Sequence, residues 1–270
     1  MRSPVSVPVV MTLAGHDPSG GAGIQADIEA IASMGCHAVS VITALTVQDT
    51  HNVKDMAPIS PGLVAAQSRA VLEDMNVAAI KIGLLGSVEI VEAIHTVLTD
   101  YPRIPVILDP ILAAGGGTEL TTADLIDALQ TLLLPLTTVL TPNSSEARRL
   151  APNADSLEAC AMALLEQGCE FVLITGAHEP SPQVINTLYG NHRRLEVFTW
   201  ERLPGEYHGS GCTLASAIAG LVAQGQEFLS TIRQAQEYTW QSLNAAYRLG
   251  KGQYIPNRLF WTHRRGAAKP

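Results

Sequence analysis

The sequence predicts an α/β protein whose mostly parallel sheet is covered by helices on both faces. Short apolar runs rich in β-branched residues alternate along the chain with segments of helical periodicity. Hydrophobic residues make up 47% of the 270 residues and aromatic residues only 5%, which suits aliphatic helices on a parallel sheet better than a β-sandwich. In sheets of this kind a ligand lies beyond the carboxyl ends of the strands, so functional residues are expected at those ends.

Each expected strand is an apolar run, and several expected helices start at a capping residue or a proline. In the first half of the chain we expect strands at 9–14, 37–48, 77–85 and 104–110, and helices at 21–34, 61–75 (with proline at its start) and 87–101, capped by Ser87. In the second half we expect strands at 137–143 and 170–176, a hairpin at 183–200 with its turn at 190–193, and helices at 121–135, 144–151, 156–168, 209–225 and 227–250, with Gly168 as a C-cap. Since no linker or repeat interrupts this pattern, we expect one domain over residues 1–270.

Composition excludes several classes of partner. The formal net charge is −8 and no basic stripe is visible, which argues against nucleic acid. No apolar stretch reaches 18 residues without polar breaks, and "MRSPVSVPVV" at the start lacks the apolar core of a signal peptide. The four cysteines have no metal-ligand spacing. These features indicate reduced thiols in a cytoplasmic protein that binds small molecules.

The first joint between strand and helix is "AGHDPSGGAG", residues 14–23. Its glycines at positions 15, 20, 21 and 23 leave room for backbone to approach a ligand closely. The stretch is neither a P-loop, because no Lys-Ser/Thr follows, nor the spaced glycine fingerprint of a dinucleotide fold. It is either a ligand-facing loop or only a tight turn.

A second joint, "YHGSGCTLASAIAG", places Gly209 and Gly211 just before an expected helix. The unpaired N–H groups of that helix start would form an anion site, supported by the helix dipole. Cys212 falls at the helix N-terminus, where we expect the pKa of a thiol to be lowered. An ordinary glycine-rich loop is the alternative.

Two further joints carry carboxylates. In "LTPNSSEARRL", Asn143 and Glu146 are three residues apart, so they form either a capping box or part of a ligand site. In "ILDP", Asp109 closes a buried strand, either as a cap or as a ligand for a cation. An anion loop, two carboxylates suited to hydrated Mg²⁺ and a possible base at one sheet edge are the parts needed for phosphoryl transfer.

These stretches, together with "ITALTVQDT", "KIGLLGS" and the tail "GKGQYIPNRLFW", resemble the signatures of hydroxymethylpyrimidine/phosphomethylpyrimidine kinases of the thiamine pathway. The resemblance covers nearly the whole chain. It implies a ribokinase-like, three-layer α/β/α fold, MgATP as phosphoryl donor, an aminopyrimidine alcohol or its monophosphate as acceptor, and a homodimer.

The resemblance also implies a role for individual residues. The pyrimidine pocket would contain Gly15, Ala22, Asp27 and Gln48, with Leu84 and Ile111 as apolar walls. Gly209, Ser210 and Gly211 would form the anion hole, with Cys212 as the base; Asn143, Thr175 and Gly176 would serve ATP, and Glu146 and Asp109 the metal. For Gln48 the chemistry agrees, because an amide that donates and accepts matches an aminopyrimidine edge.

Three positions depart from the family's pattern. Gly115 and Thr175 stand where the family usually has phosphate-facing lysines, and His16 stands where a small hydroxyl residue is common. His16 is either a surface imidazole or a phosphate contact. These departures keep two alternatives open: a pyridoxal-type kinase on the same scaffold, and a non-catalytic pyrimidine-binding protein.

Overall fold

The computed structural model describes residues 7–265. The expectation of no signal peptide concerns residues 1–10, of which 1–6 lie outside the described residues. Among the described residues, no helix combines the length and the apolar character needed to cross a bilayer.

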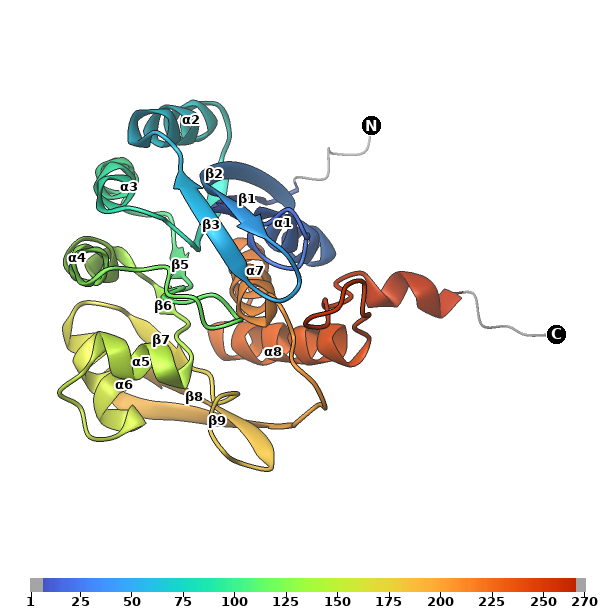
Figure 1. Cartoon of the computed structure of the whole chain (residues 1–270). Coiled ribbons are helices and arrows are strands. Elements are labelled where there is room, and N and C mark those ends of the chain that lie inside the picture. The colour runs from blue at the N-terminus through green and yellow to red at the C-terminus, as the bar shows by residue number, and fades with distance from the viewer. Residues whose placement is uncertain (1–6, 266–270) are drawn as a thin grey trace, which may run out of the picture.

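The centre of the molecule is a nine-stranded sheet with the order β3-β2-β1-β4-β5-β6-β7-β8-β9 (Figure 1). Six neighbouring strands, from β2 to β7 in that order, are parallel, whereas β3, β8 and β9 pair antiparallel. The strands are β1 Val9–His16, β2 His37–Gln48, β3 Val53–Pro58, β4 Val77–Ile82, β5 Val106–Leu108, β6 Val139–Leu140, β7 Phe171–Ile174, β8 Gln183–Gly190 and β9 Arg193–Glu201.

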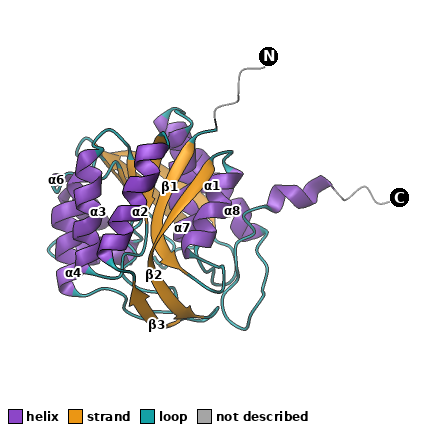
Figure 2. Cartoon of the chain, turned by 90° about the horizontal axis from the view of Figure 1, so that it is seen from above, coloured by secondary structure: helices purple, strands orange, loops and turns teal. Residues whose placement is uncertain are grey.

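Helices cover the sheet in two layers, so the expected three-layer α/β/α arrangement is confirmed (Figures 1 and 2). One layer consists of α1 Gly23–Ser33, α7 Ser210–Ala223 and α8 Phe228–Asn244; the other consists of α2 Pro61–Asp74, α3 Val88–Asp100, α4 Ala123–Ala128, α5 Ser144–Leu150 and α6 Leu157–Glu166. Because side chains alternate along a strand, Ala79 of β4 joins one core and Ile80 the other.

Local chemistry explains several element boundaries. The Ser87 hydroxyl accepts the N–H of Ile90 and caps α3, as expected. Gly168 adopts φ +108° just beyond α6, a conformation that a side chain would strain. The β8–β9 turn has positive φ at Asn191 and His192, the pair that a two-residue hairpin turn needs.

Three expectations about elements were wrong in detail. The helix expected at 121–135 is α4 followed by a π-helical turn, Leu129–Leu133, and a 3₁₀ turn, Leu134–Leu136, because Pro135 has no N–H to continue a regular helix. The helix expected to reach residue 250 ends at Asn244, after which the chain pairs Tyr247 with Ile255. The strand β3 was not expected, because this short edge strand contains Lys, Asp and Pro.

The strand order places the glycine-rich loop at a special point. From β1 the chain crosses to β2 on one side, and later strands add from β4 onward on the other side. The carboxyl end of β1 therefore lies at the topological switch point, where α/β sheets bind ligands.

Candidate active site

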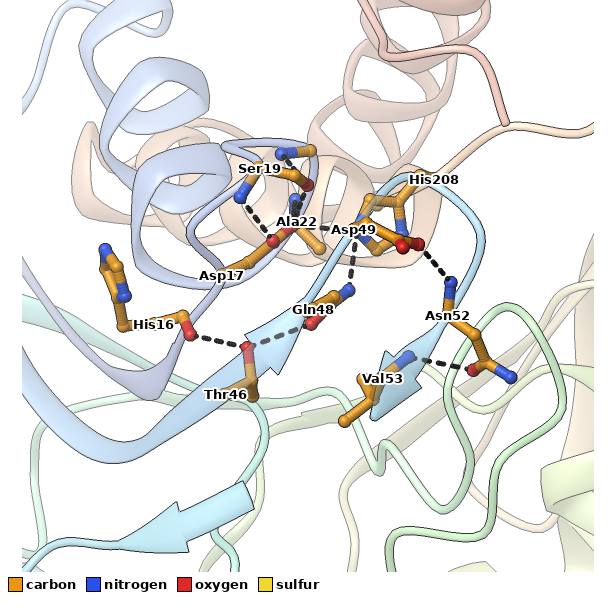
Figure 3. A network of polar contacts seen from close by, with 12 residues as sticks. His16, Asp17, Ser19, Ala22, Thr46, Gln48, Asp49, Asn52, Val53 and His208 are labelled. Carbon is orange, nitrogen blue, oxygen red and sulfur yellow. Dashed lines mark hydrogen bonds and ion pairs between the residues drawn. The ribbon is translucent and has the colours of Figure 1, made fainter. Parts of the chain in front are cut away.

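The loop after β1 is organised by Asp17. Its carboxylate accepts the backbone N–H groups of Ser19 at 2.8 Å and Ala22 at 2.9 Å, and the Ser19 hydroxyl at 3.0 Å (Figure 3). Gly23 has φ +60°, and a Cβ there would lie 2.2 Å from the carbonyl oxygen of Gly15. The loop therefore folds back onto the end of β1, and only glycine allows that approach.

Most of the residues expected in the pyrimidine pocket gather around this loop. A Cβ on Gly15 would lie 2.9 Å from Leu84, and one on Gly83 would lie 3.7 Å from Ile111, so the ends of β1, β4 and β5 meet here. Ala22 is held by Asp17, and Gln48 lies half-buried at the end of β2.

Asp27 is a correction to this set. Its side chain is fully buried, and its carboxylate contacts the Lys81 ammonium at 2.8 and 3.0 Å and the hydroxyls of Thr12 at 2.6 Å and Ser216 at 2.7 Å. Both oxygens are thus engaged inside the protein. Asp27 is the anion of a buried ion pair beneath the pocket, and does not line it.

The anion loop at the start of α7 lies between the β1 loop and Asp109. Gly209 adopts φ +78°, and a Cβ there would lie 2.0 Å from the carbonyl oxygen of Gly21. A Cβ on Gly211 would lie 3.5 Å from Oδ2 of Asp109. Ser210 begins the helix, and no acidic residue lies in its first turn. The free N–H groups of this helix start therefore occur where the predicted pocket and a carboxylate meet.

Cys212 sits in the first turn of α7, but the expected lowering of its pKa is wrong. Burial raises the pKa of the Cys212 thiol to about 12, although the nearby Lys81 charge acts in the opposite direction. At neutral pH the thiol is therefore protonated in this arrangement.

Asp109 and Glu146 form the predicted carboxylate pair. Burial raises the pKa of Asp109 to about 6, and burial together with the Asp109 charge raises the pKa of Glu146 to about 8. Oδ2 of Asp109 is buried without a hydrogen-bond partner. Two mutually repelling carboxylates with an orphaned oxygen fit a cation that takes one or two protein carboxylates and keeps its waters, as Mg²⁺ does. Within residues 7–265 no group of three or more His, Cys, Asp or Glu side chains forms a metal cluster.

Asn143 and Glu146 form the predicted capping box, and Glu146 also belongs to the carboxylate pair. The Asn143 side chain accepts the N–H of Glu146 at 2.9 Å, and Glu146 accepts the N–H of Asn143 at 2.8 Å. Thr175 at the end of β7 pairs with Asn143, and its carbonyl accepts the N–H of Ser144 at 3.0 Å. A Cβ on Gly176 would lie 2.1 Å from a carbonyl oxygen of β8. The residues expected to serve ATP are thus neighbours at the ends of β6 and β7.

Gly115 and His16, two of the positions that depart from the family's pattern, differ in their surroundings. Gly115 is exposed, and a Cβ there would lie 3.1 Å from the side chain of Gln253, whose amide donates to the Gly115 carbonyl. His16 is half-buried; its carbonyl accepts the Thr46 hydroxyl, and its ring points away from Gln48 (Figure 3).

Four residues that sequence reasoning missed hold the site together: Asp17, Lys81, His208 and Arg258. Lys81 was detectable as a single charge in an apolar strand. His208 directly precedes the anion loop and contacts Asp17 across 191 residues. Arg258, from the C-terminal segment, is buried, and donates to Thr213 at 2.9 Å, to Glu29 at 3.2 Å and to the carbonyl of Gly21. No pattern near residue 258 or residue 17 indicates these partners.

Comparisons with known proteins agree with this geometry. The family model for phosphomethylpyrimidine kinase matches residues 17–257. A hydroxymethylpyrimidine/phosphomethylpyrimidine kinase from Streptomyces coelicolor is 36% identical over 259 residues, covering 92% of this chain and 93% of that protein. The thiamine biosynthesis bifunctional protein ThiED from Geobacter sulfurreducens is 36% identical over 262 residues, 96% of this chain, which spans 54% of that longer protein.

Among solved structures, a Bacillus subtilis pyridoxal kinase in complex with ADP superposes with a TM-score of 0.86 at 26% identity, covering 96% of this chain and all of that one. Kinases named for different acceptors, pyridoxal in one case and a pyrimidine in the other, are therefore similar to this chain. The family model matches most of the chain, and the chain belongs to the phosphomethylpyrimidine kinase family.

Proposed function

We propose that this protein transfers the γ-phosphoryl group of MgATP to 4-amino-5-hydroxymethyl-2-methylpyrimidine, to its monophosphate, or to both. The observation that carries the proposal is the position of the anion loop, Gly209–Gly211. It abuts the β1 loop on one side and, on the other, the Asp109 carboxylate, whose Oδ2 has no hydrogen-bond partner. A transferring phosphoryl group needs that neighbourhood of N–H donors, acceptor pocket and metal-binding carboxylates.

The chain's own residues have separable tasks in this proposal. Gln48 reads the aminopyrimidine edge, while Leu84 and Ile111 wall the ring and exclude water. The N–H groups of Gly209, Ser210 and Gly211 hold the phosphoryl oxygens.

Cys212 is the proposed proton acceptor for the attacking hydroxyl. Since its thiol is protonated at neutral pH, it can act only after losing its own proton, which the Lys81 charge favours and burial opposes.

The Mg²⁺ site would use Glu146 and Asp109, and Asn143, Thr175 and Gly176 would lie beside the nucleotide. When bound, the metal would neutralise charge on the transferring phosphates. Glu146 must be ionised to contribute, so metal binding would displace the proton that burial favours. A homodimer and a cytoplasmic location remain predictions; size-exclusion chromatography with light scattering would test the first.

A pyridoxal-type kinase is the second candidate, favoured by the structural likeness to the B. subtilis enzyme. A non-catalytic pyrimidine binder is disfavoured, because binding alone explains neither the carboxylate pair nor the anion loop beside it.

ADP release with purified protein separates the three candidates. The acceptors would be the pyrimidine alcohol, its monophosphate and pyridoxal, each with ATP and Mg²⁺. We expect ADP with one or both pyrimidines and loss of turnover in Glu146→Gln. ADP formation with pyridoxal alone would favour the second candidate, and acceptor binding without ADP would favour the binder.

A further inference from the structure

Gln48 belongs to a closed ring of polar contacts that joins the ends of β1 and β2 to the segment before α7 (Figure 3). The Thr46 hydroxyl lies 2.9 Å from the His16 carbonyl and 3.1 Å from the Gln48 side-chain oxygen. The Gln48 side-chain nitrogen lies 2.9 Å from Nε2 of His208, which in turn lies 2.7 Å from Oδ2 of Asp17. Asp17 directly follows His16 in the chain, which closes the ring.

The ionised Asp17 carboxylate determines that Nε2 of His208 carries a hydrogen. Burial acts to raise the pKa of Asp17, but hydrogen bonds from His208 and Ser19 outweigh it and hold that pKa below its usual range. The ionised carboxylate only accepts, so Nε2 of His208 carries a hydrogen and donates it. A nitrogen that donates to Asp17 cannot also accept from the Gln48 amide nitrogen.

The other side of the ring leads to the same conclusion. Thr46 has a single hydroxyl hydrogen, and the His16 carbonyl can only accept it. Since that hydrogen is already directed at a carbonyl, the Thr46 oxygen is better matched by an amide N–H of Gln48, which it can accept. The clash between two donors disappears if the Gln48 amide is turned over, an exchange that leaves the shape of the side chain unchanged. Its oxygen then faces Nε2 of His208 at 2.9 Å and shares that hydrogen with Asp17 in a three-centre hydrogen bond, while its nitrogen donates to Thr46.

We propose that His208 is a specificity-determining positioning residue that orients the Gln48 amide for the acceptor. This inference rests on the proposed function. In the turned orientation one amide N–H and one oxygen lone pair remain for the pocket, in a fixed order. A ring nitrogen beside an exocyclic amino group complements that order. A ligand without the amino group has no donor for the Gln48 side-chain oxygen and leaves that oxygen without a partner.

Calorimetric titration of two ligands tests the proposal: the aminopyrimidine alcohol and its analogue without the amino group. The variants are His208→Phe, which removes the N–H and keeps an aromatic ring, and His208→Gln, whose amide nitrogen can reach the Nε2 position. His37→Phe is the matched control, because His37 is exposed at the opposite end of β2. ADP affinity, measured in parallel, reports whether the anion loop is intact.

We expect the wild type to prefer the amino compound, and His208→Phe to reduce that preference roughly 10-fold, the worth of one buried hydrogen bond. His208→Gln should restore much of the preference, and ADP affinity and the control should be unchanged. If His208→Phe does not fold, Thr46→Val removes the partner at the other end of the amide and should cause the same loss.

Other results would overturn the proposal. An unchanged preference in folded His208→Phe means that Gln48 is oriented without His208. A parallel loss of ADP affinity, or no rescue by His208→Gln, means that His208 only supports the loop. A wild type that binds both ligands equally means that the amide does not read the amino group. If wild-type protein forms no ADP with either pyrimidine, the proposed function itself fails, and that result is separate from these binding ratios.

Discussion

The buried ion pair between Lys81 and Asp27 allows a sharp test of how the pocket is supported. Lys81→Met removes the ammonium and keeps most of the side-chain length. It leaves the Asp27 carboxylate with only the hydroxyls of Thr12 and Ser216, in surroundings with no solvent exposure at either charged side chain. Breaking a fully buried pair by removing one partner costs about 3–5 kcal/mol, because the remaining charge is left uncompensated.

Urea unfolding monitored by circular dichroism measures this cost. We expect the free energy of unfolding of Lys81→Met to fall by about 3–5 kcal/mol, and the double variant Lys81→Met/Asp27→Leu to recover at least half of the loss, since no buried charge remains. A loss below about 1 kcal/mol for Lys81→Met would refute the reasoning. A further variant, Asp27→Asn, tests the role of Asp27: a substrate-binding residue would change acceptor KM without a large change in stability.

Four further predictions concern the site itself. Gln48→Leu should weaken binding of the pyrimidine alcohol by about 1–3 kcal/mol in calorimetry, because polar ring atoms lose their partner; unchanged affinity would remove Gln48 from the pocket. Gly115→Lys should lower KM for ATP or the phosphorylated pyrimidine by about 1 kcal/mol equivalent and leave the neutral alcohol unaffected, as an exposed charge pair is weak. Cys212→Ala should reduce kcat for the alcohol roughly 10²–10⁴-fold if the thiolate is the base, and wild-type kcat should then rise with pH through the neutral range, because the thiol pKa lies near 12. The folded pKa of Glu146 is raised from 4.5 to about 8, so the folded chain holds a proton that the unfolded chain releases; metal-free stability should fall as pH rises through that window, and Glu146→Gln should flatten the slope.

The sequence predicted what depends on local pattern. Alternating apolar runs located the parallel strands, and glycines marked the two loops that meet at Gly21 and Gly209. The three-residue spacing of Asn143 and Glu146 indicated a capping box, which the structure contains. Each of these features involves residues that are close in the chain or repeat with a fixed period.

What the sequence did not reveal depends on burial and on distant partners. Cys212 was expected at a helix start that lowers its pKa, but the surrounding core outweighs the helix, and no local pattern measures that burial. Asp27 was expected in the pyrimidine pocket, and only the fold places it against Lys81, 54 residues later in the chain. His208 and Asp17 become partners only once the sheet brings their segments together.

The contact of Arg258 with the carbonyl of Gly21 spans 237 residues, nearly the full length of the chain. During synthesis the first βα unit is therefore available long before its last partner is made. The entropy lost in closing so long a loop is offset only after the intervening strands have paired. The anion loop should therefore reach its final position late in folding. A chain that stops short of residue 258 would retain all nine strands and α7 but lack this clamp. Nucleotide binding in nascent or truncated chains should consequently appear later than secondary structure, which makes ligand affinity a reporter of chain completion.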